Sequence, residues 1–161
     1  RIGMAALKYY LLKYAPKTSF EYDPKASIDF QGQTGPYALF NYARTRSLLR
    51  KGEDRGDDLS FDVTAVRRLG TPQELELVRK LYSWPELVAR AAQTYDPSRV
   101  TEYVFELCKA FAFIFTDKDN HPIATCDDDE LRRGRLLLAS AVGNTIEAAL
   151  SLLGIDVLEE M

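Results

Sequence analysis

A broad apolar stripe follows Asp96-Pro97 in the sequence. Apolar residues recur there at steps of three and four, which is the spacing of one face of an α-helix. They are Val100, Tyr103, Val104, Leu107, Phe111 and Ile114. The other side is also apolar, at Phe105, Cys108, Ala112 and Phe113. We therefore predict a helix that is buried on most of its sides.

Helix signals also mark the first third of the chain. Strong helix formers without glycine or proline run from Met4 to about Tyr14, and Pro16 ends the run. Thr34 is a suitable cap for a helix that reaches about Arg50, with a glycine and a proline in its first turn. Residues 51–58 are charged and contain glycine, so we predict an exposed loop with the strongest tendency to disorder in the chain.

The last two thirds contain further helix starts. Thr71 and Glu74 form a capping box that opens a helix to about Tyr82, and Ser83 and Glu86 repeat this spacing for another helix to about residue 94. The last helix follows the acidic residues 127–130, and Gly154 is a suitable cap for its end. Its predicted inner face comprises Leu131, Leu138, Val142, Ile146, Ala149 and Leu153. Without convincing strand alternation, the fold class is all-α, an antiparallel helix bundle.

Composition narrows the possible functions. A chain of 161 residues is long enough for one domain with its own core, and 46% hydrophobic with 28% charged residues is typical of a soluble globular protein. The net charge of -3 argues against nucleic-acid binding through bulk positive charge. A local basic surface is possible, at Arg44, Arg46, Arg50, Lys51, Arg55, Arg67 and Arg68. The balancing acids are elsewhere in the sequence, at residues 127–130 and 159–160. A charged run of this kind is more often simply a solvated face.

The usual catalytic and metal-binding motifs are missing. The sequence has no P-loop, GxGxxG, GxSxG or HExxH motif, so we predict no catalytic residue and no metal site. His121 stands in a polar turn and is expected on the surface, and Cys108 is expected in the core. The acids at 127–130 are interpreted as helix-dipole partners. No apolar run approaches the roughly 18 residues that cross a membrane. A binding or scaffold role remains.

Aromatic residues and an arginine are concentrated in the helix that begins near Thr34. Helical spacing places Tyr37, Phe40 and Arg44 on one face, with Asn41 and Leu48. Leu39, Tyr42, Arg46 and Leu49 share the opposite face, which is the better candidate for the core. The first face would be exposed or half-exposed, and rings beside an arginine can stack unpaired RNA bases. The alternative is that these rings simply pack in the bundle.

Several motifs resemble the C-terminal anticodon-binding domain of arginyl-tRNA synthetases, which are class I aminoacyl-tRNA synthetases. Residues 3–10 (GMAALKYY) are similar to the opening Asp-Ala-Leu-Arg signature, with Ala and Lys in place of its first and last residues. Residues 30–37 (FQGQTGPY), followed by 42–47 (YARTRS), are similar to the Phe-Glu-Gly-Asn-Thr-Gly-Pro-Tyr helix of the family. Residues 152–155 and 159–161 are similar to its terminal Leu-Gly-Ile and Glu-Arg-Met. The resemblance covers essentially the whole chain.

The resemblance implies an all-α bundle of the class I anticodon-binding type over residues 1–161, with residues 1–30 as the stem that joins a catalytic domain outside this sequence. The whole enzyme would attach arginine to its tRNA using ATP and Mg, whereas this piece would need no cofactor and catalyse nothing. Its partners would be the anticodon loop of arginine tRNA, with the middle cytosine as the main identity base, and the catalytic domain. We expect a cytoplasmic monomer without membrane contact.

The resemblance also implies which residues bind the anticodon. They are Tyr37, Phe40, Arg44, Phe115 and Met161. Phe40 and Phe115 stand where tyrosines are common in the family, so stacking would remain but a phenolic hydrogen bond would be missing. Glu160 stands where an arginine is common, which removes a positive charge near the proposed pocket.

Two other hypotheses remain. The chain could be a structural bundle whose Tyr37 face docks another protein, and a flat apolar patch would then be expected. It could also be the equivalent domain of another class I synthetase, with the same fold and a different anticodon.

Overall fold

The computed structural model describes residues 1–160, and in this range the chain forms seven helices and no strand. They are α1 (Ile2–Leu12), α2 (Pro24–Ser27), α3 (Gly35–Arg55), α4 (Val63–Arg67), α5 (Pro72–Thr94), α6 (Ser98–Thr116) and α7 (Asp129–Leu152). The all-α class predicted from the sequence is confirmed. Within the same residues, no helix is both long enough and apolar enough to span a membrane.

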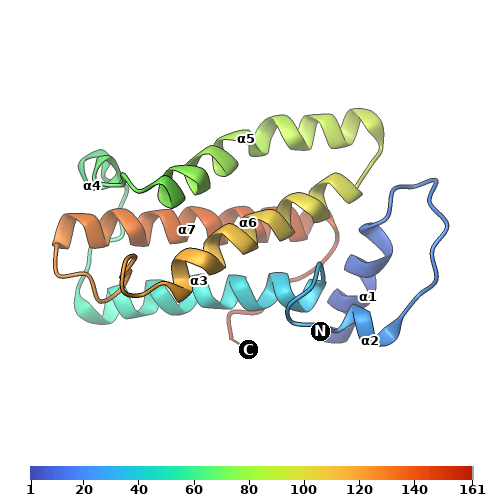
Figure 1. The fold of residues 1–161 in the computed structure, drawn as a ribbon, viewed down its shortest axis with the longest axis horizontal. Helices are drawn as coiled ribbons and strands as arrows, with labels where there is room; N and C mark the ends of the chain where they lie inside the picture. The colour runs from blue at the N-terminus through green and yellow to red at the C-terminus, as the bar shows by residue number, and fades with distance from the viewer. Residues whose placement is uncertain (161) are drawn as a thin grey trace.

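The four long helices build the body of the bundle, and α1 packs across one end of it (Figure 1). Successive long helices run in opposite directions, as predicted. Helix α7 is central, because it packs against α3, α4, α5 and α6. The apolar core fills the space between these helices, with Leu107, Leu136 and Ile146 among its fully buried side chains.

Helix α3 crosses α1 at very short range. Gly35, the first residue of α3, lies against the backbone of Ala5, and a Cβ at this position would come within 2.4 Å of the Ala5 carbonyl oxygen. Only glycine permits this approach. Thr34 caps the helix as predicted, since its Oγ1 accepts a hydrogen bond from the Tyr37 backbone N–H at 3.2 Å. The crossing and the cap together fix the start of α3 and therefore the positions of its aromatic residues.

The loop predicted over residues 51–58 is wrong for residues 51–55. Helix α3 continues to Arg55 and ends at Gly56, whose φ of 88° is left-handed. Gly52 is buried near the Leu136 side chain, and Asp57 pairs with Arg132 at 2.7 Å. Charged residues do not stop a helix when one of its sides still packs against a neighbour.

The capping box at Thr71 and Glu74 is confirmed, but the break predicted at Ser83 is wrong. Helix α5 runs through Pro85 to Thr94, and the Ser83 hydroxyl donates to the Lys80 carbonyl at 2.8 Å instead of capping a new helix. Pro85 is exposed, so the carbonyl that lacks an amide partner can be solvated. A capping pattern within a longer helical run therefore does not have to start a helix.

The stripe predicted in α6 is confirmed, because all six of its residues are buried. Cys108 is also buried, as predicted. The prediction for the opposite side holds only in part, since Phe113 is 55% exposed. At the start of α7, the Asp128 side chain accepts a hydrogen bond from the Leu131 backbone N–H at 3.0 Å, which supports the helix-dipole interpretation of the acidic run. Gly154 follows this helix with a left-handed φ of 67°.

Candidate nucleic-acid interface

The aromatic face of α3 is half-buried. Tyr37, Phe40 and Arg44 each keep part of their surface accessible, which agrees with the half-exposed face predicted from helical spacing. Asn41 and Leu48 on the same face are buried, and the Asn41 Nδ2 donates to the Tyr37 carbonyl at 2.9 Å. Helix α6 packs against this side of α3, so only part of the face is available for binding.

The opposite face of α3 is core, as predicted. Leu39, Tyr42 and Leu49 are buried there, whereas Arg46 keeps about a third of its side chain exposed. Burial raises the pKa of Tyr42. The hydroxyl of Tyr42 still finds a partner, since it donates to Glu147 Oε2 at 3.2 Å. Because this side of α3 packs in the core, the face with Tyr37, Phe40 and Arg44 is the candidate binding surface.

Arg44 lies between two phenylalanine rings from different helices. Its guanidinium carbon is 4.1 Å from the ring centre of Phe40 and 4.9 Å from that of Phe115, which is in α6. Both distances are within the range of cation–π attraction. The Asn41 side-chain oxygen accepts a hydrogen bond from Arg44 at 3.4 Å. Partial burial lowers the pKa of Arg44, but a guanidinium remains charged at neutral pH.

These three side chains line an open hollow of about 360 Å³, within the range of small-molecule pockets. The lining residues are Phe40, Ala43, Arg44, Ser47, Arg50, Phe115, Glu159 and Glu160. Sequence reasoning missed Ser47 and Arg50 as lining residues. The signal was available, because Ser47 follows Arg44 by three residues and Arg50 follows Ala43 by seven, and such steps return to one side of a helix.

The other two residues implied by the family resemblance are not among the described residues that line the hollow. The half-buried ring of Tyr37 meets the ring of Phe105 edge-on, with centres 5.7 Å apart, and burial raises the pKa of its hydroxyl. Met161 lies outside the described residues. Phe30, which is 46% exposed, packs edge-on against Phe40 at 6.3 Å and extends the aromatic surface.

The last described residues bring negative charge to the hollow. Glu159 pairs with Arg46 at 3.6 Å, and Glu160 pairs with Arg50 at 3.9 Å. In Figure 1 the segment after α7 turns back toward α3. Arg68 likewise pairs with Asp128 at 2.5 Å. The acids that are distant in the sequence are therefore neighbours of three arginines of the basic run in space.

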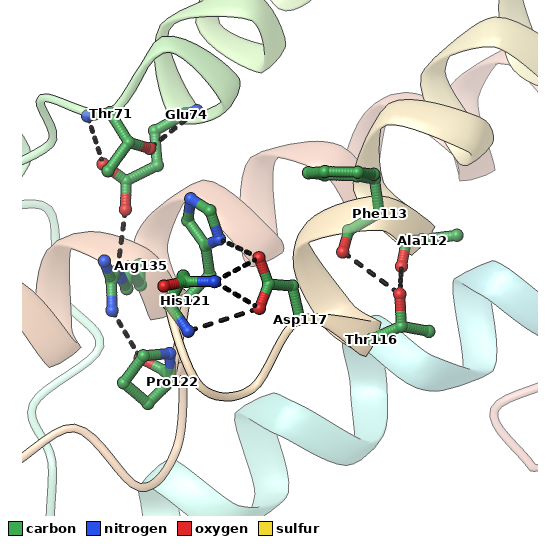
Figure 2. A network of polar contacts seen from close by, with 10 residues as sticks. Thr71, Glu74, Ala112, Phe113, Thr116, Asp117, His121, Pro122 and Arg135 are labelled. Carbon is green, nitrogen blue, oxygen red and sulfur yellow. Dashed lines mark hydrogen bonds and ion pairs between the residues drawn. The ribbon is translucent and has the colours of Figure 1, made fainter.

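A buried polar network joins α5, α7 and the turn after α6 (Figure 2). The Glu74 side chain accepts hydrogen bonds from the backbone N–H of Thr71 and from Arg135, the latter at 2.7 Å. Burial acts to raise the pKa of Glu74, but these bonds outweigh it and hold the pKa below its usual value. Arg135 also donates to the Pro122 carbonyl at 2.7 Å. Its donors are thus used inside the fold.

The network also corrects the expectation for His121. This side chain is only 5% exposed, and its Nδ1 lies 3.2 Å from an Asp117 carboxylate oxygen. The Arg135–Pro122 hydrogen bond draws the turn against α7, so a histidine in a polar segment is buried. Throughout residues 1–160, no group of three or more histidine, cysteine, aspartate or glutamate side chains could hold a metal ion.

Comparisons with known proteins give one consistent result. The family described as the DALR anticodon binding domain matches residues 38–161. The arginine–tRNA ligases of Flavobacterium psychrophilum and Clostridium acetobutylicum are each 36% identical to this chain, over 161 and 162 residues. The alignments cover 99% and 100% of this chain. The solved Thermus thermophilus arginyl-tRNA synthetase matches 99% of this chain and 26% of its own, with a TM-score of 0.87 and 26% identity. The chain spans about a quarter of the length of the curated relatives it matches.

Proposed function

The chain belongs to the DALR anticodon-binding domain family, and from that premise we propose that it is the anticodon-loop recognition domain of an arginine–tRNA ligase. The whole enzyme attaches arginine to its tRNA using ATP and Mg. Because the chain corresponds to about a quarter of its relatives, that chemistry belongs to a catalytic domain outside these 161 residues. The role of this domain is to select and position the tRNA.

The observation that carries this proposal is the convergence of Phe40, Arg44 and Phe115 beside an open hollow. Aromatic rings stack unpaired bases, and each stacked base contributes about 1 to 3 kcal/mol. A guanidinium next to them can hold a phosphate or stack in turn. One half-buried site therefore offers both the base-binding and the phosphate-binding chemistry that a single-stranded RNA loop requires.

Individual roles follow from this chemistry. Phe40 and Phe115 form an aromatic wall that stacks bases, and Arg44 binds a phosphate or extends the stack. Tyr37, held by its contact with Phe105, adds a further ring to the anticodon-binding residues. Met161, which lies outside the described residues, is a further contact for the middle anticodon cytosine, as the family resemblance implies. Phe40 and Phe115 have no hydroxyl group, so these two rings recognise a base through its face.

The geometry favours RNA over the docking hypothesis. A protein-docking face would be flat and apolar, whereas this surface is hollowed and has two arginines and two glutamates among its lining residues. Acidic residues are depleted in protein interfaces. The two rings beside an arginine supply the stacking and phosphate-binding groups that a single-stranded nucleic acid requires.

Residues 1–30 form the stem that joins the domain to the catalytic part. Several apolar side chains in this segment are exposed, including Met4 at 57%, Leu11 at 46% and Ile28 at 55%. Exposed apolar side chains at one end of a domain are suited to contact with a neighbouring domain. The enzyme works in the cytoplasm as a monomer.

The experiment that tests the proposal is a fluorescence-anisotropy titration of a labelled arginine-tRNA anticodon stem-loop with the chain. A second stem-loop has guanine in place of the middle cytosine. The proposal expects tighter binding of the cytosine loop and loss of that preference in Tyr37→Ala. Equal affinity for both loops at all salt concentrations would contradict it.

A further inference from the structure

Resting on the proposed function, we infer that Glu159 and Glu160 act as a displaceable cover over Arg46 and Arg50, which bind RNA phosphates once the glutamates move away. The inference goes beyond Arg44 and the rings, because it assigns two further arginines to the interface. It also gives Glu159 and Glu160 a role in controlling which ligands reach these arginines.

The two ion pairs are weak in geometry. Their N–O distances of 3.6 and 3.9 Å exceed the roughly 2.7 to 2.9 Å of charge-assisted hydrogen bonds. Both glutamate side chains are largely exposed, at 66% and 83%. Exposed pairs of this kind contribute little and are screened by salt. An RNA phosphate that can bind a guanidinium through two hydrogen bonds is therefore a strong competitor.

The segment before the glutamates is anchored. Ile155 is buried, and the half-buried Val157 and Leu158 pack against the core. The side chains of Glu159 and Glu160 follow this anchored segment and line the same hollow as Phe40 and Phe115. Displacing these carboxylates does not require the bundle to open.

The position of Arg50 connects the two ion pairs to the hollow. Arg50 and both glutamates line the hollow together with Arg44. A loop whose base stacks on Phe40 or Phe115 would bring its phosphates within reach of these arginines. The covering glutamates repel phosphate in the free protein, and they restrict the exposed arginines to ligands that can displace the cover.

The test is the affinity of the anticodon stem-loop for Glu159→Gln, Glu160→Gln and the double variant. Removal of each carboxylate is expected to tighten binding about two- to fivefold at low salt, with the gain disappearing at high salt. Glu86→Gln is the matched control, since it makes the same charge change at an exposed pair with Arg90 on α5. It is expected to change the affinity by less than either tail variant.

A double-mutant cycle identifies the partner. If the cover acts through Arg46, then Glu159→Gln gives no gain in an Arg46→Gln background, and the same relation holds for Glu160 and Arg50. Equal gains with and without the arginine would overturn the inference, as would gains no larger than that of Glu86→Gln.

The outcomes also separate the cover from the proposed function. Cytosine-selective binding that the tail variants leave unchanged would overturn the cover and leave the function standing. Binding that the tail variants strengthen without cytosine preference would overturn the function and support the cover. Failure of both the wild-type chain and the double variant to bind the loop would overturn both.

Discussion

Arginine–carboxylate pairs occur in two regions of the molecule, buried between helices in one and exposed on α3 in the other. The Glu74–Arg135 pair is 2.7 Å long, and both side chains are at most 6% exposed. The Arg46–Glu159 pair on α3 is 3.6 Å long, with side chains 35% and 66% exposed. Arg135 also donates a hydrogen bond to the Pro122 backbone carbonyl, so its guanidinium is held inside the fold. The second arginine keeps 35% of its side chain exposed, so residue type alone does not distinguish an arginine held inside the fold from one that is open to solvent.

The largest effect is expected when the buried pair is broken. Arg135→Ala leaves the Glu74 carboxylate buried without its charged partner, which should lower the free energy of unfolding by about 3 to 5 kcal/mol. Urea denaturation measures this change. Arg90→Ala breaks an exposed pair and should cost at most about 1 kcal/mol. Equal losses for the two variants would remove the distinction between the two kinds of pair.

Lowering the pH should narrow the gap between wild type and Arg135→Ala. The folded pKa of Glu74 lies below its unfolded value, so its stabilising contribution is complete above about pH 4.3 and is lost as the pH falls through the folded pKa. Protonation removes the charge that Arg135 would otherwise balance. Urea midpoints measured from neutral pH to pH 3 provide the comparison. A stability difference between wild type and Arg135→Ala that grows on acidification would contradict the lowered pKa of Glu74.

The aromatic wall should control RNA affinity with a small effect on stability. Phe40→Ala is expected to weaken anticodon stem-loop binding by about 5- to 150-fold, which corresponds to the loss of one stacked base. Phe113→Ala is the matched control, because Phe113 is an exposed phenylalanine on α6 that is not among the lining residues of the hollow. Anisotropy titrations measure both variants, with circular dichroism to confirm folding. Equal weakening by Phe113→Ala would place the RNA elsewhere.

The smallest expected effect is on the salt dependence of binding. If Arg44 contacts a phosphate, Arg44→Ala should reduce the slope of log affinity against log salt by about one unit. Arg44→Lys keeps the charge but has no planar guanidinium to lie between the rings, so it should preserve the slope and lose affinity. Anisotropy at several salt concentrations gives both quantities. A slope that Arg44→Ala leaves unchanged would rule out the phosphate role.

The sequence predicted what depends on neighbours along one helix. The α6 stripe, the Thr71 capping box and the partial exposure of Tyr37, Phe40 and Arg44 all follow from spacing, because steps of three and four residues return to one helix face. The lining positions Ser47 and Arg50 were accessible to the same reasoning.

The sequence could not reveal partners that only the packing of helices brings together. Asp57 and Arg132 are 75 residues apart, yet they form a buried pair, and the Arg132 hydrogen bond holds the Asp57 pKa below its usual value. His121 is buried because a turn folds back on α7. Glu159 and Glu160 reach Arg46 and Arg50 only after the last segment returns to α3. The sequence identifies the charged residues, whereas the fold determines which of them pair with one another.

The most direct test of the account follows the arginine Nε–Hε signals of the isotope-labelled chain by NMR while the anticodon stem-loop is added. Arg132 and Arg135 donate through Nε to Asp57 and Glu74, so their signals should stay in place. The signals of Arg44, Arg46 and Arg50 should shift with the added RNA. Shifts confined to Arg132 and Arg135, or an unmoved Arg44 signal when RNA is bound, would contradict the account.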